Sequence, residues 1–186
     1  MKAVFLDRDG VINEYPGHFK YVACREEFRF LPGAKAALEK LSAQGLAIFV
    51  VSNQAGVTKG IYDLDELNAI TRKMLDGLGP HVKVSGVRYC IHREEDNCSC
   101  RKPKPGMIEE IAAEARKGGR EIEMAASFFV GDSVRDVEAG RNAGLKTILV
   151  FSGRERPENR ASWKAAPDFT ARDLSEAAEI ILRGVR

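Results

Sequence analysis

Apolar runs of strand length alternate with amphipathic stretches of helix length along nearly the whole chain, and this alternation is the feature that most restricts the fold. Parallel strands need a long crossover between them, usually a helix, and buried parallel strands are continuously apolar. The pattern therefore predicts an α/β fold, a doubly wound and mostly parallel sheet with helices on both faces. The expected strands are Ala3–Leu6, Leu46–Val51, Val87–Ile91, Ser127–Val130 and Lys146–Phe151, and the expected helices are Gly33–Gln44, Leu64–Leu78, Pro105–Lys117, Ser133–Ala143 and Leu174–Leu182.

The length and composition suit one domain spanning residues 1–186, because a chain of 186 residues with 44% apolar content can bury a substantial core. The net charge is +2 and no basic run is long enough to follow a nucleic acid backbone. The longest apolar run, Leu46–Val51, is too short to cross a membrane, and the first residues lack the pattern of a signal peptide. We expect a soluble, cytoplasmic monomer, with residues 152–167 forming a surface loop.

Polar residues follow the expected strands at the points where those strands end. Asp7, Ser52, His92 and Asp132 each come directly after an apolar run. In open parallel sheets, ligands bind beyond the carboxyl ends of the strands. The sequence therefore predicts a site at that edge of the sheet.

Asp7 and Asp9 form the first candidate group. Strand geometry alone does not place these two acids, because the apolar strand ends at Leu6 and the chain must leave regular strand geometry at Asp7. Gly10 supplies the backbone freedom for a tight exit. Both carboxylates can then face one cavity, although a surface turn built from Asp and Gly explains this segment equally well.

Two further strand ends carry candidate residues. Ser52-Asn53-Gln54 offers a hydroxyl, amides and backbone N–H groups for phosphate oxygens, but an N-cap or turn is the commoner use of such residues. Gly131-Asp132 opens a helix that places Asp136 one turn further on the same face, so one acid can reach the cavity while the other braces it. The alternative is a capping acid followed by a surface acid. If Asp7, Asp9 and Asp132 converge, their repulsion and their oxygen ligands favour Mg²⁺.

The segment from residue 90 to residue 100 predicts a metal site. Cys90, His92, Cys98 and Cys100 provide three thiolates and one imidazole, which complete a tetrahedral zinc shell and leave no position for a reactive water. The zinc would therefore be structural; a redox disulfide and unrelated buried cysteines are the alternatives. The remaining Cys24 is expected to be a small core residue.

A basic pair, Arg101-Lys102, follows the last expected zinc ligand and is enclosed by prolines. A zinc-bound loop ending in these residues would hold both cations toward a phosphate, which Arg grips in bidentate fashion and Lys attracts as a point charge. A solvated basic patch is the usual alternative.

In this order, Asp7-Arg8-Asp9-Gly10, Ser52-Asn53-Gln54, Lys102 and Gly131-Asp132 resemble the four motifs of the haloacid dehalogenase superfamily of phosphohydrolases. The cysteine and histidine segment makes the chain similar to the zinc-containing branch whose members act on D-glycero-D-manno-heptose 1,7-bisphosphate or histidinol phosphate. Pro105-Gly106-Met107 is more similar to the heptose enzymes. Glu14–Lys20 is longer than expected for the substrate loop, and Ser133 stands where a heptose enzyme can carry Lys.

The resemblance implies a magnesium-dependent phosphatase that converts the heptose bisphosphate to its 1-phosphate through an aspartyl-phosphate. Asp7 would be the nucleophile and Asp9 the general acid and base, with Ser52 and Lys102 stabilising the phosphoryl oxygens. The implied Mg²⁺ ligands are Asp7, the backbone carbonyl of Asp9, and Asp132. The implied substrate contacts are Asn53, Gln54, Arg101, His18 and Tyr21, and the implied supporting residues are Gly10, Gly131 and Asp136.

The spacing of the motifs leaves no room for an inserted cap domain, because helices and strands occupy most of the intervals from Asp7 to Ser52 and from Ser52 to Lys102. Short loops must then shape the site, which suits a small phosphorylated metabolite such as a sugar bisphosphate. Histidinol phosphate is the alternative substrate. A phospho-accepting receiver and a zinc-binding interaction module without catalysis are more distant alternatives.

Overall fold

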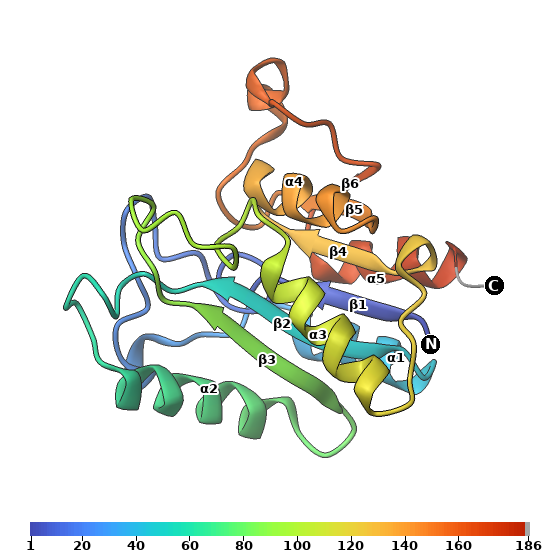
Figure 1. Cartoon of the computed structure of the whole chain (residues 1–186), viewed down its shortest axis with the longest axis horizontal. Coiled ribbons are helices and arrows are strands. Elements are labelled where there is room, and N and C mark those ends of the chain that lie inside the picture. The colour runs from blue at the N-terminus through green and yellow to red at the C-terminus, as the bar shows by residue number, and fades with distance from the viewer. Residues whose placement is uncertain (185–186) are drawn as a thin grey trace.

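The computed structural model describes residues 1–184, which form a six-stranded parallel sheet with the strand order β3-β2-β1-β4-β5-β6 (Figure 1). The predicted α/β class and the doubly wound parallel sheet are confirmed. The strands are β1 (Ala3–Leu6), β2 (Ala47–Asn53), β3 (Val84–Cys90), β4 (Phe128–Gly131), β5 (Lys146–Val150) and β6 (Phe169–Ala171). The helices are α1 (Ala34–Ala43), α2 (Leu64–Leu78), α3 (Gly106–Lys117), α4 (Val134–Asn142) and α5 (Leu174–Gly184), with 3-10 turns η1 (Arg25–Glu27), η2 (Met124–Ala126) and η3 (Pro157–Ser162).

The expected elements all form, and the main differences are the bounds of β2 and β3 and an additional strand, β6. β2 continues two residues beyond the predicted end, so Ser52 and Asn53 belong to the strand and do not follow it. β3 begins at Val84, three residues before the predicted start, because this edge strand is only partly buried and lacks a continuous apolar run. β6 was not predicted, since its three residues are too few to show a pattern.

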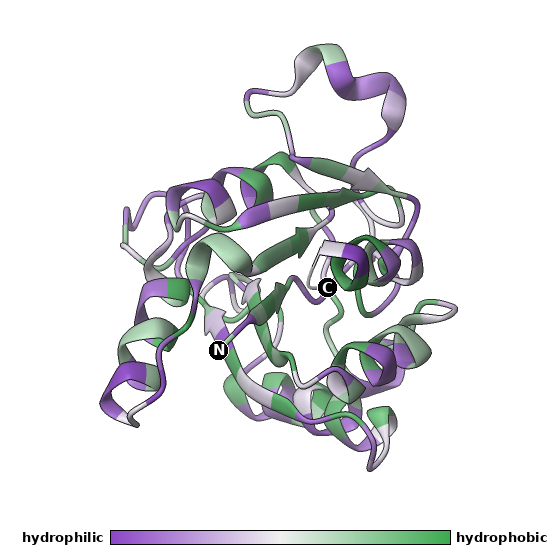
Figure 2. Ribbon diagram, turned by 90° about the vertical axis from the view of Figure 1, so that its right-hand side faces the viewer, coloured by the Kyte–Doolittle hydropathy of each residue, from purple (hydrophilic) through white to green (hydrophobic). Residues whose placement is uncertain are grey.

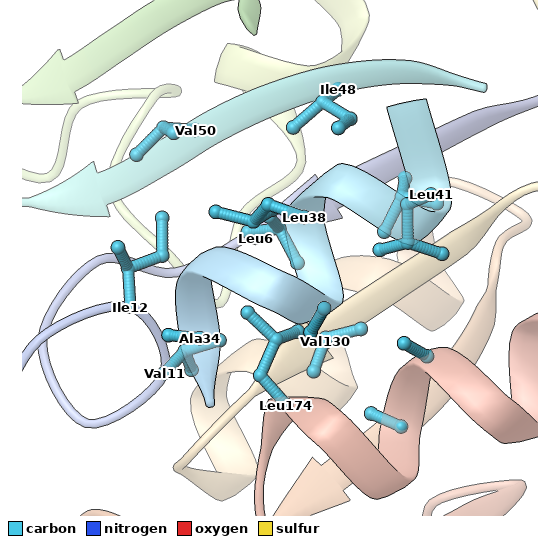
Figure 3. Close-up of a cluster of buried hydrophobic side chains, with 14 of the residues drawn as sticks. Leu6, Val11, Ile12, Ala34, Leu38, Leu41, Ile48, Val50, Val130 and Leu174 are labelled. Carbon is cyan, nitrogen blue, oxygen red and sulfur yellow. The ribbon is translucent and has the colours of Figure 1, made fainter. Parts of the chain in front are cut away.

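Successive strand residues point to opposite faces of the sheet and build two separate cores. On one face, Leu6 packs with α1, α2 and α5; Figure 3 shows Leu38 and Leu41 of α1 facing Leu6 and Ile48. On the other face, Phe5 packs with α3 and α4. The hydrophobic colour in Figure 2 accordingly lies on the strands and on the inward sides of the helices. Across residues 1–184, no helix is long and apolar enough to span a bilayer.

The strand order reverses between β1 and β4, and this point determines where the site lies. From β1 the chain adds β2 and β3 on one side, then returns to add β4, β5 and β6 on the other. Leu6 is in register with both Val50 and Val130, so the residues after β1 lie between the ends of β2 and β4. The loops after β1, β2 and β3 lie at the arrowhead end of the sheet in Figure 1, where a ligand crevice is expected.

The connection between β5 and β6 projects away from the sheet at the top of Figure 1 and contains η3. The expected surface loop over residues 152–167 therefore has a short helical turn of its own. Trp163 holds this turn through a hydrogen bond from its Nε1 to Glu155 Oε2, at 3.0 Å, and through stacking on Phe151. Its near end returns to the carboxyl edge of the sheet at Gly153 and Arg154.

Candidate active site

Asp7 lies at the floor of a cavity of about 330 Å³ that opens at the switch between β1 and β4. Its N–H donates to Val130 O at 3.0 Å, which continues the pairing of β1 with β4 one residue beyond the strand. Its carboxylate accepts the N–H of Arg8 at 2.7 Å. Among the predicted residues, those that line the cavity are Asp7, Asp9, Tyr21, Ser52, Asn53, Arg101, Lys102, Asp132 and Asp136.

Lys102 joins the acidic residues of this floor. Its Nζ lies 3.1 Å from Asp7 Oδ2 and 2.6 Å from Asp136 Oδ1, and it donates to Val51 O at 2.9 Å. The side chain is 3% exposed, so water contributes little to holding it. Burial alone would lower the pKa of Lys102, but Asp136 and Asp7 outweigh that effect and raise the pKa to about 12. Lys102 is therefore a fixed positive charge beside Asp7.

Asp7, Asp132 and Asp136 bring carboxylate oxygens to within 4.8 Å of one another. Burial raises the pKa of Asp7 to about 6, and burial together with Asp136 and Asp7 raises the pKa of Asp132 well above its ordinary value. Three acids thus face a single ammonium group, that of Lys102. A cluster of oxygen donors with excess negative charge suits a hard cation such as Mg²⁺, so the residues present fit this ion.

Gly10 and Gly131 leave the space in which these acids lie close together. Gly10 has a φ of 80°, and a Cβ at this position would lie 2.3 Å from Asp132 Oδ2. A Cβ on Gly131 would lie 2.1 Å from the Cβ of Asp136. Larger residues at either position would displace an acid of the cluster.

Asp136 acts as a brace, which agrees with the supporting role expected for it. Its Oδ2 accepts the N–H of Ser133 at 3.0 Å and the hydroxyl of Ser133 at 2.6 Å, closing the first turn of α4 as a capping box. Its Oδ1 faces Lys102. Asp132, by contrast, is held by the N–H of Arg154 at 2.7 Å.

Gln54 does not line the cavity, although the sequence predicted a substrate contact. Its side chain is fully buried behind Asp9, where it bonds to Asp9, Arg8, Ser52 and Tyr62. The reason is that the chain continues the pairing of β2 with β3 at this residue, where the Gln54 N–H donates to Cys90 O at 2.7 Å, so that the Gln54 side chain stays enclosed beside the sheet. Arg8, which the sequence did not single out, is also fully buried in this network.

Ser52 and Asn53 face the cavity from the end of β2. A hydrogen bond from the Ser52 hydroxyl lowers the pKa of Asp7, although burial raises it more strongly. The side-chain amide of Asn53 exchanges two hydrogen bonds of 3.1 Å with the backbone of Lys102, donating to its carbonyl and accepting from its N–H. Asn53 therefore positions the Lys102 segment, a role that the sequence did not suggest.

His18 does not line the cavity either, and its predicted substrate contact is not supported. It is exposed and packs edge-on against Phe19, with 3.9 Å between the ring centroids, because the loop after β1 turns its Tyr21 side inward. Tyr21 does line the cavity and lies against Tyr62.

The predicted metal-binding thiols come together in the loop after β3. The Sγ atoms of Cys90, Cys98 and Cys100 lie 3.2–3.6 Å apart, and His92 Nδ1 lies 3.3 Å from Cys100 and 3.7 Å from Cys90. Ligands on a tetrahedral zinc ion would be separated by about 3.8 Å between sulfurs and about 3.6 Å between sulfur and nitrogen. The four side chains could therefore hold one metal ion.

Cations line the upper part of the cavity. Arg101 donates from Nη1 to His92 O at 3.0 Å, which ties its side chain to the cysteine loop. Four further cations line the cavity: Lys20 and Lys59, which lie in the short loops expected to shape the site but were not singled out, and Arg135 and Arg154, which the sequence did not suggest. Arg154 could have been found from its position just after β5, since the carboxyl ends of all parallel strands share one edge.

The chain matches known proteins over most of its length. Residues 99–177 match the family model described as HAD-hydrolase-like. A Rhodopseudomonas palustris protein named D-glycero-beta-D-manno-heptose-1,7-bisphosphate 7-phosphatase is 42% identical over 151 residues, which cover 77% of this chain and 79% of that protein. A Chlorobaculum tepidum protein named D-glycero-D-manno-heptose-1,7-bisphosphate 7-phosphatase is 37% identical over 186 residues, and the alignment covers 95% of this chain and 92% of that protein.

A solved structure agrees with the sequence relatives. The D,D-heptose 1,7-bisphosphate phosphatase of Bordetella bronchiseptica, crystallised with magnesium and phosphate, aligns with a TM-score of 0.86 and 33% identity. The alignment covers 98% of this chain and 99% of that one. The family resemblance seen in the motifs is thus confirmed, and the chain belongs to the haloacid dehalogenase superfamily, among its phosphatases.

Proposed function

We propose that this phosphatase hydrolyses D-glycero-D-manno-heptose 1,7-bisphosphate. It would remove the phosphate group at position 7 and leave the 1-phosphate. The observation that carries the proposal is the cavity floor, where Asp7 lies 3.1 Å from Lys102, beside Ser52 and opposite Asp132. The names of the relatives at 34–42% identity support the choice of substrate.

The floor is arranged for phosphoryl transfer in two steps. Asp7 attacks phosphorus while the bond to the sugar oxygen breaks; the bonding electrons stay on that oxygen, and Asp9 supplies its proton. Water then attacks the aspartyl-phosphate and gives its proton to Asp9, so phosphate leaves and Asp7 is restored. Lys102 and Ser52 stabilise charge on the phosphoryl oxygens throughout.

Magnesium would be held by the carboxylates of Asp7 and Asp132 and by the backbone carbonyl of Asp9. It would neutralise the acids and stabilise phosphoryl charge. The aligned structure containing magnesium and phosphate supports this role, as does the excess of acids over cations in the floor. Asp136 would remain outside the metal site because Lys102 and Ser133 already engage it.

The wall of cations around the cavity, which forms its rim, supports the proposal that the substrate carries a second phosphate. These cations, which come from four different loops and one helix, are Lys20, Lys59, Arg101, Arg135 and Arg154. Arg groups bind phosphate in bidentate geometry, and several cations are needed to balance two phosphate groups. We assign this wall to the phosphate that is not cleaved.

The cluster of Cys90, His92, Cys98 and Cys100 would hold a structural zinc ion. Four protein ligands leave no open position, so the ion would fold the loop and take no part in the reaction. The loop leads directly to Arg101 and Lys102, which links zinc binding to the site. Free thiols used as metal ligands are typical of a reducing compartment, so we place the protein in the cytoplasm, acting as a monomer on a small metabolite.

The test is phosphate release in the presence of Mg²⁺ from heptose bisphosphate and, in parallel, from histidinol phosphate. We expect a kcat/KM at least tenfold higher for the bisphosphate. Faster turnover of histidinol phosphate would replace the proposed substrate. A phospho-protein that persists after treatment with acetyl phosphate would indicate a phospho-accepting receiver. Failure to hydrolyse any phosphomonoester would favour a zinc-binding module without catalysis.

A further inference from the structure

Gln54 is enclosed by four side chains that come from three segments of the chain. It is fully buried, and so is Arg8 on one side of it. Its Nε2 lies 2.9 Å from Asp9 Oδ2 and 3.1 Å from Ser52 Oγ. Its Oε1 lies 2.6 Å from the Tyr62 hydroxyl and 3.2 Å from Arg8 Nη2.

The chemistry of these neighbours determines the orientation of the Gln54 amide. Arg8 has only donors, so it must face the amide oxygen, and the amide nitrogen then faces Asp9 Oδ2, which accepts from it. A flipped amide would oppose donor to donor and acceptor to acceptor. Tyr62 must then donate to Oε1, and Ser52 must accept from Nε2.

This polarity directs the single proton of the Ser52 hydroxyl. Because Ser52 Oγ accepts from Gln54, and because Ser52 lines the cavity together with Asp7, its hydrogen is available to an acceptor on the cavity side. In the first step of the proposed reaction, that acceptor is a phosphoryl oxygen. Gln54 thus determines which way this donor points.

The same amide orients the carboxylate of Asp9. Asp9 Oδ1 accepts from Asn13 at 2.8 Å and from Arg8 Nε at 3.1 Å, and Oδ2 accepts from Arg8 Nη2 and from Gln54, each at 2.9 Å. These four bonds fix both oxygens of a side chain that lines the cavity. Losing the Gln54 donor would leave Oδ2 with the Arg8 bond but without its second donor.

We infer that Gln54, held by Arg8 and Tyr62, is a positioning residue that aligns the proton of Ser52 and the carboxyl group of Asp9 with the phosphoryl group on Asp7. The inference rests on the proposed function, since it assigns Asp9 the proton given to the leaving oxygen. As the P–O bond breaks, its electrons move to that oxygen and the proton passes from Asp9 to it. A substrate whose leaving group needs no proton therefore depends less on Gln54.

The test compares Gln54→Met with the wild type on two substrates in the presence of Mg²⁺. The sugar phosphate has an alkoxide leaving group that needs a proton, whereas p-nitrophenyl phosphate has a leaving group that does not. We expect kcat to fall about 100-fold on the sugar phosphate and about tenfold on p-nitrophenyl phosphate, because misplaced Ser52 affects both and misplaced Asp9 only the first. KM should stay within about twofold, since Gln54 does not line the cavity.

Two further variants separate positioning from loss of stability. Tyr62→Phe removes only one donor to Gln54 and should shift the ratio of the two kcat values about two- to threefold in the same direction; it decides the matter if Gln54→Met does not fold. Thr147 lies on β5, outside this network, and its buried hydroxyl donates to Asp168. Thr147→Val removes that bond and should leave the ratio of the two kcat values unchanged.

The outcomes distinguish the inference from the function on which it rests. If Gln54→Met lowers kcat equally on both substrates, the positioning role is overturned while the enzyme remains a phosphatase. If Gln54→Met does not fold, an unchanged ratio of the two kcat values in Tyr62→Phe has the same meaning. A wild type that hydrolyses neither substrate would instead overturn the proposed function.

Discussion

The floor and the rim of the cavity are built in opposite ways. The floor consists of Asp7, Ser52, Lys102, Asp132 and Asp136, which are largely buried and held by hydrogen bonds or ion pairs. The rim consists of Lys20, Lys59, Arg101, Arg135 and Arg154, which lie on loops or at a helix start. Lys102 in the floor is 3% exposed, whereas Arg135 in the rim is 39% exposed and pairs with Glu94, which is itself exposed.

This difference separates chemistry from selection. Fixed, buried charges stabilise a transition state because they need no rearrangement during the reaction. Exposed cations on loops are screened by solvent, so each contributes modestly to binding. Floor variants should therefore change kcat, rim variants should change KM, and the cysteine loop, which joins the two, should affect both.

The largest effect is expected in the floor, for Asp7→Asn. Without the nucleophile, turnover should fall by about 10⁴-fold or more. Burial raises the pKa of Asp7 to about 6, so above that pH its charge opposes folding, and the neutral amide should leave the thermal midpoint unchanged or higher when Mg²⁺ is absent. Phosphate release and thermal unfolding measure the two effects. Turnover above a trace would remove Asp7 as the nucleophile and with it the distinction between floor and rim.

An intermediate effect is expected in the cysteine loop, for Cys98→Ser. Losing one zinc ligand should lower the zinc content and reduce kcat/KM for the bisphosphate about 10- to 100-fold, because Arg101 and Lys102 lose their support. Cys24→Ser is the matched control, since Cys24 is a free thiol outside the cluster. Full activity in a zinc-free Cys98→Ser protein would show that the loop folds and positions its cations without metal.

The smallest effect is expected at the rim, for Arg154→Gln. KM for the bisphosphate should rise about two- to fivefold with kcat little changed, since one exposed charge contributes about 0.5–1 kcal/mol. Lys164→Gln removes a charge from the same connection outside the cavity and should leave KM unchanged. Steady-state kinetics at two salt concentrations would check the electrostatic origin. A loss in kcat as large as that of a floor variant would place Arg154 in the chemistry.

Local sequence patterns predicted the sheet, its helices and the floor residues, because strand ends and glycine turns are fixed by neighbouring residues. The same patterns did not reveal that Arg8 is buried beside Asp9 or that Gln54 lies behind them, since this network depends on bonds of Gln54 to residues 45 and 46 positions away. His18 was placed in the site only by analogy, and the loop turned it outward. Arg101 of the rim was predicted, but the other four rim cations were not singled out, because lone Arg and Lys residues look like ordinary surface charges in a sequence.

The paired hydrogen bonds between Asn53 and the Lys102 backbone have a consequence for insertions and deletions. The Asn53 amide imitates a neighbouring peptide group, so it fixes the register of the residue that follows Arg101 as a sheet partner would. One residue added or removed between Cys100 and Lys102 would offer this amide the wrong peptide unit and turn the ammonium group away from Asp7. Changes of length should therefore be tolerated earlier in the cysteine loop, between His92 and Cys98, and not after it.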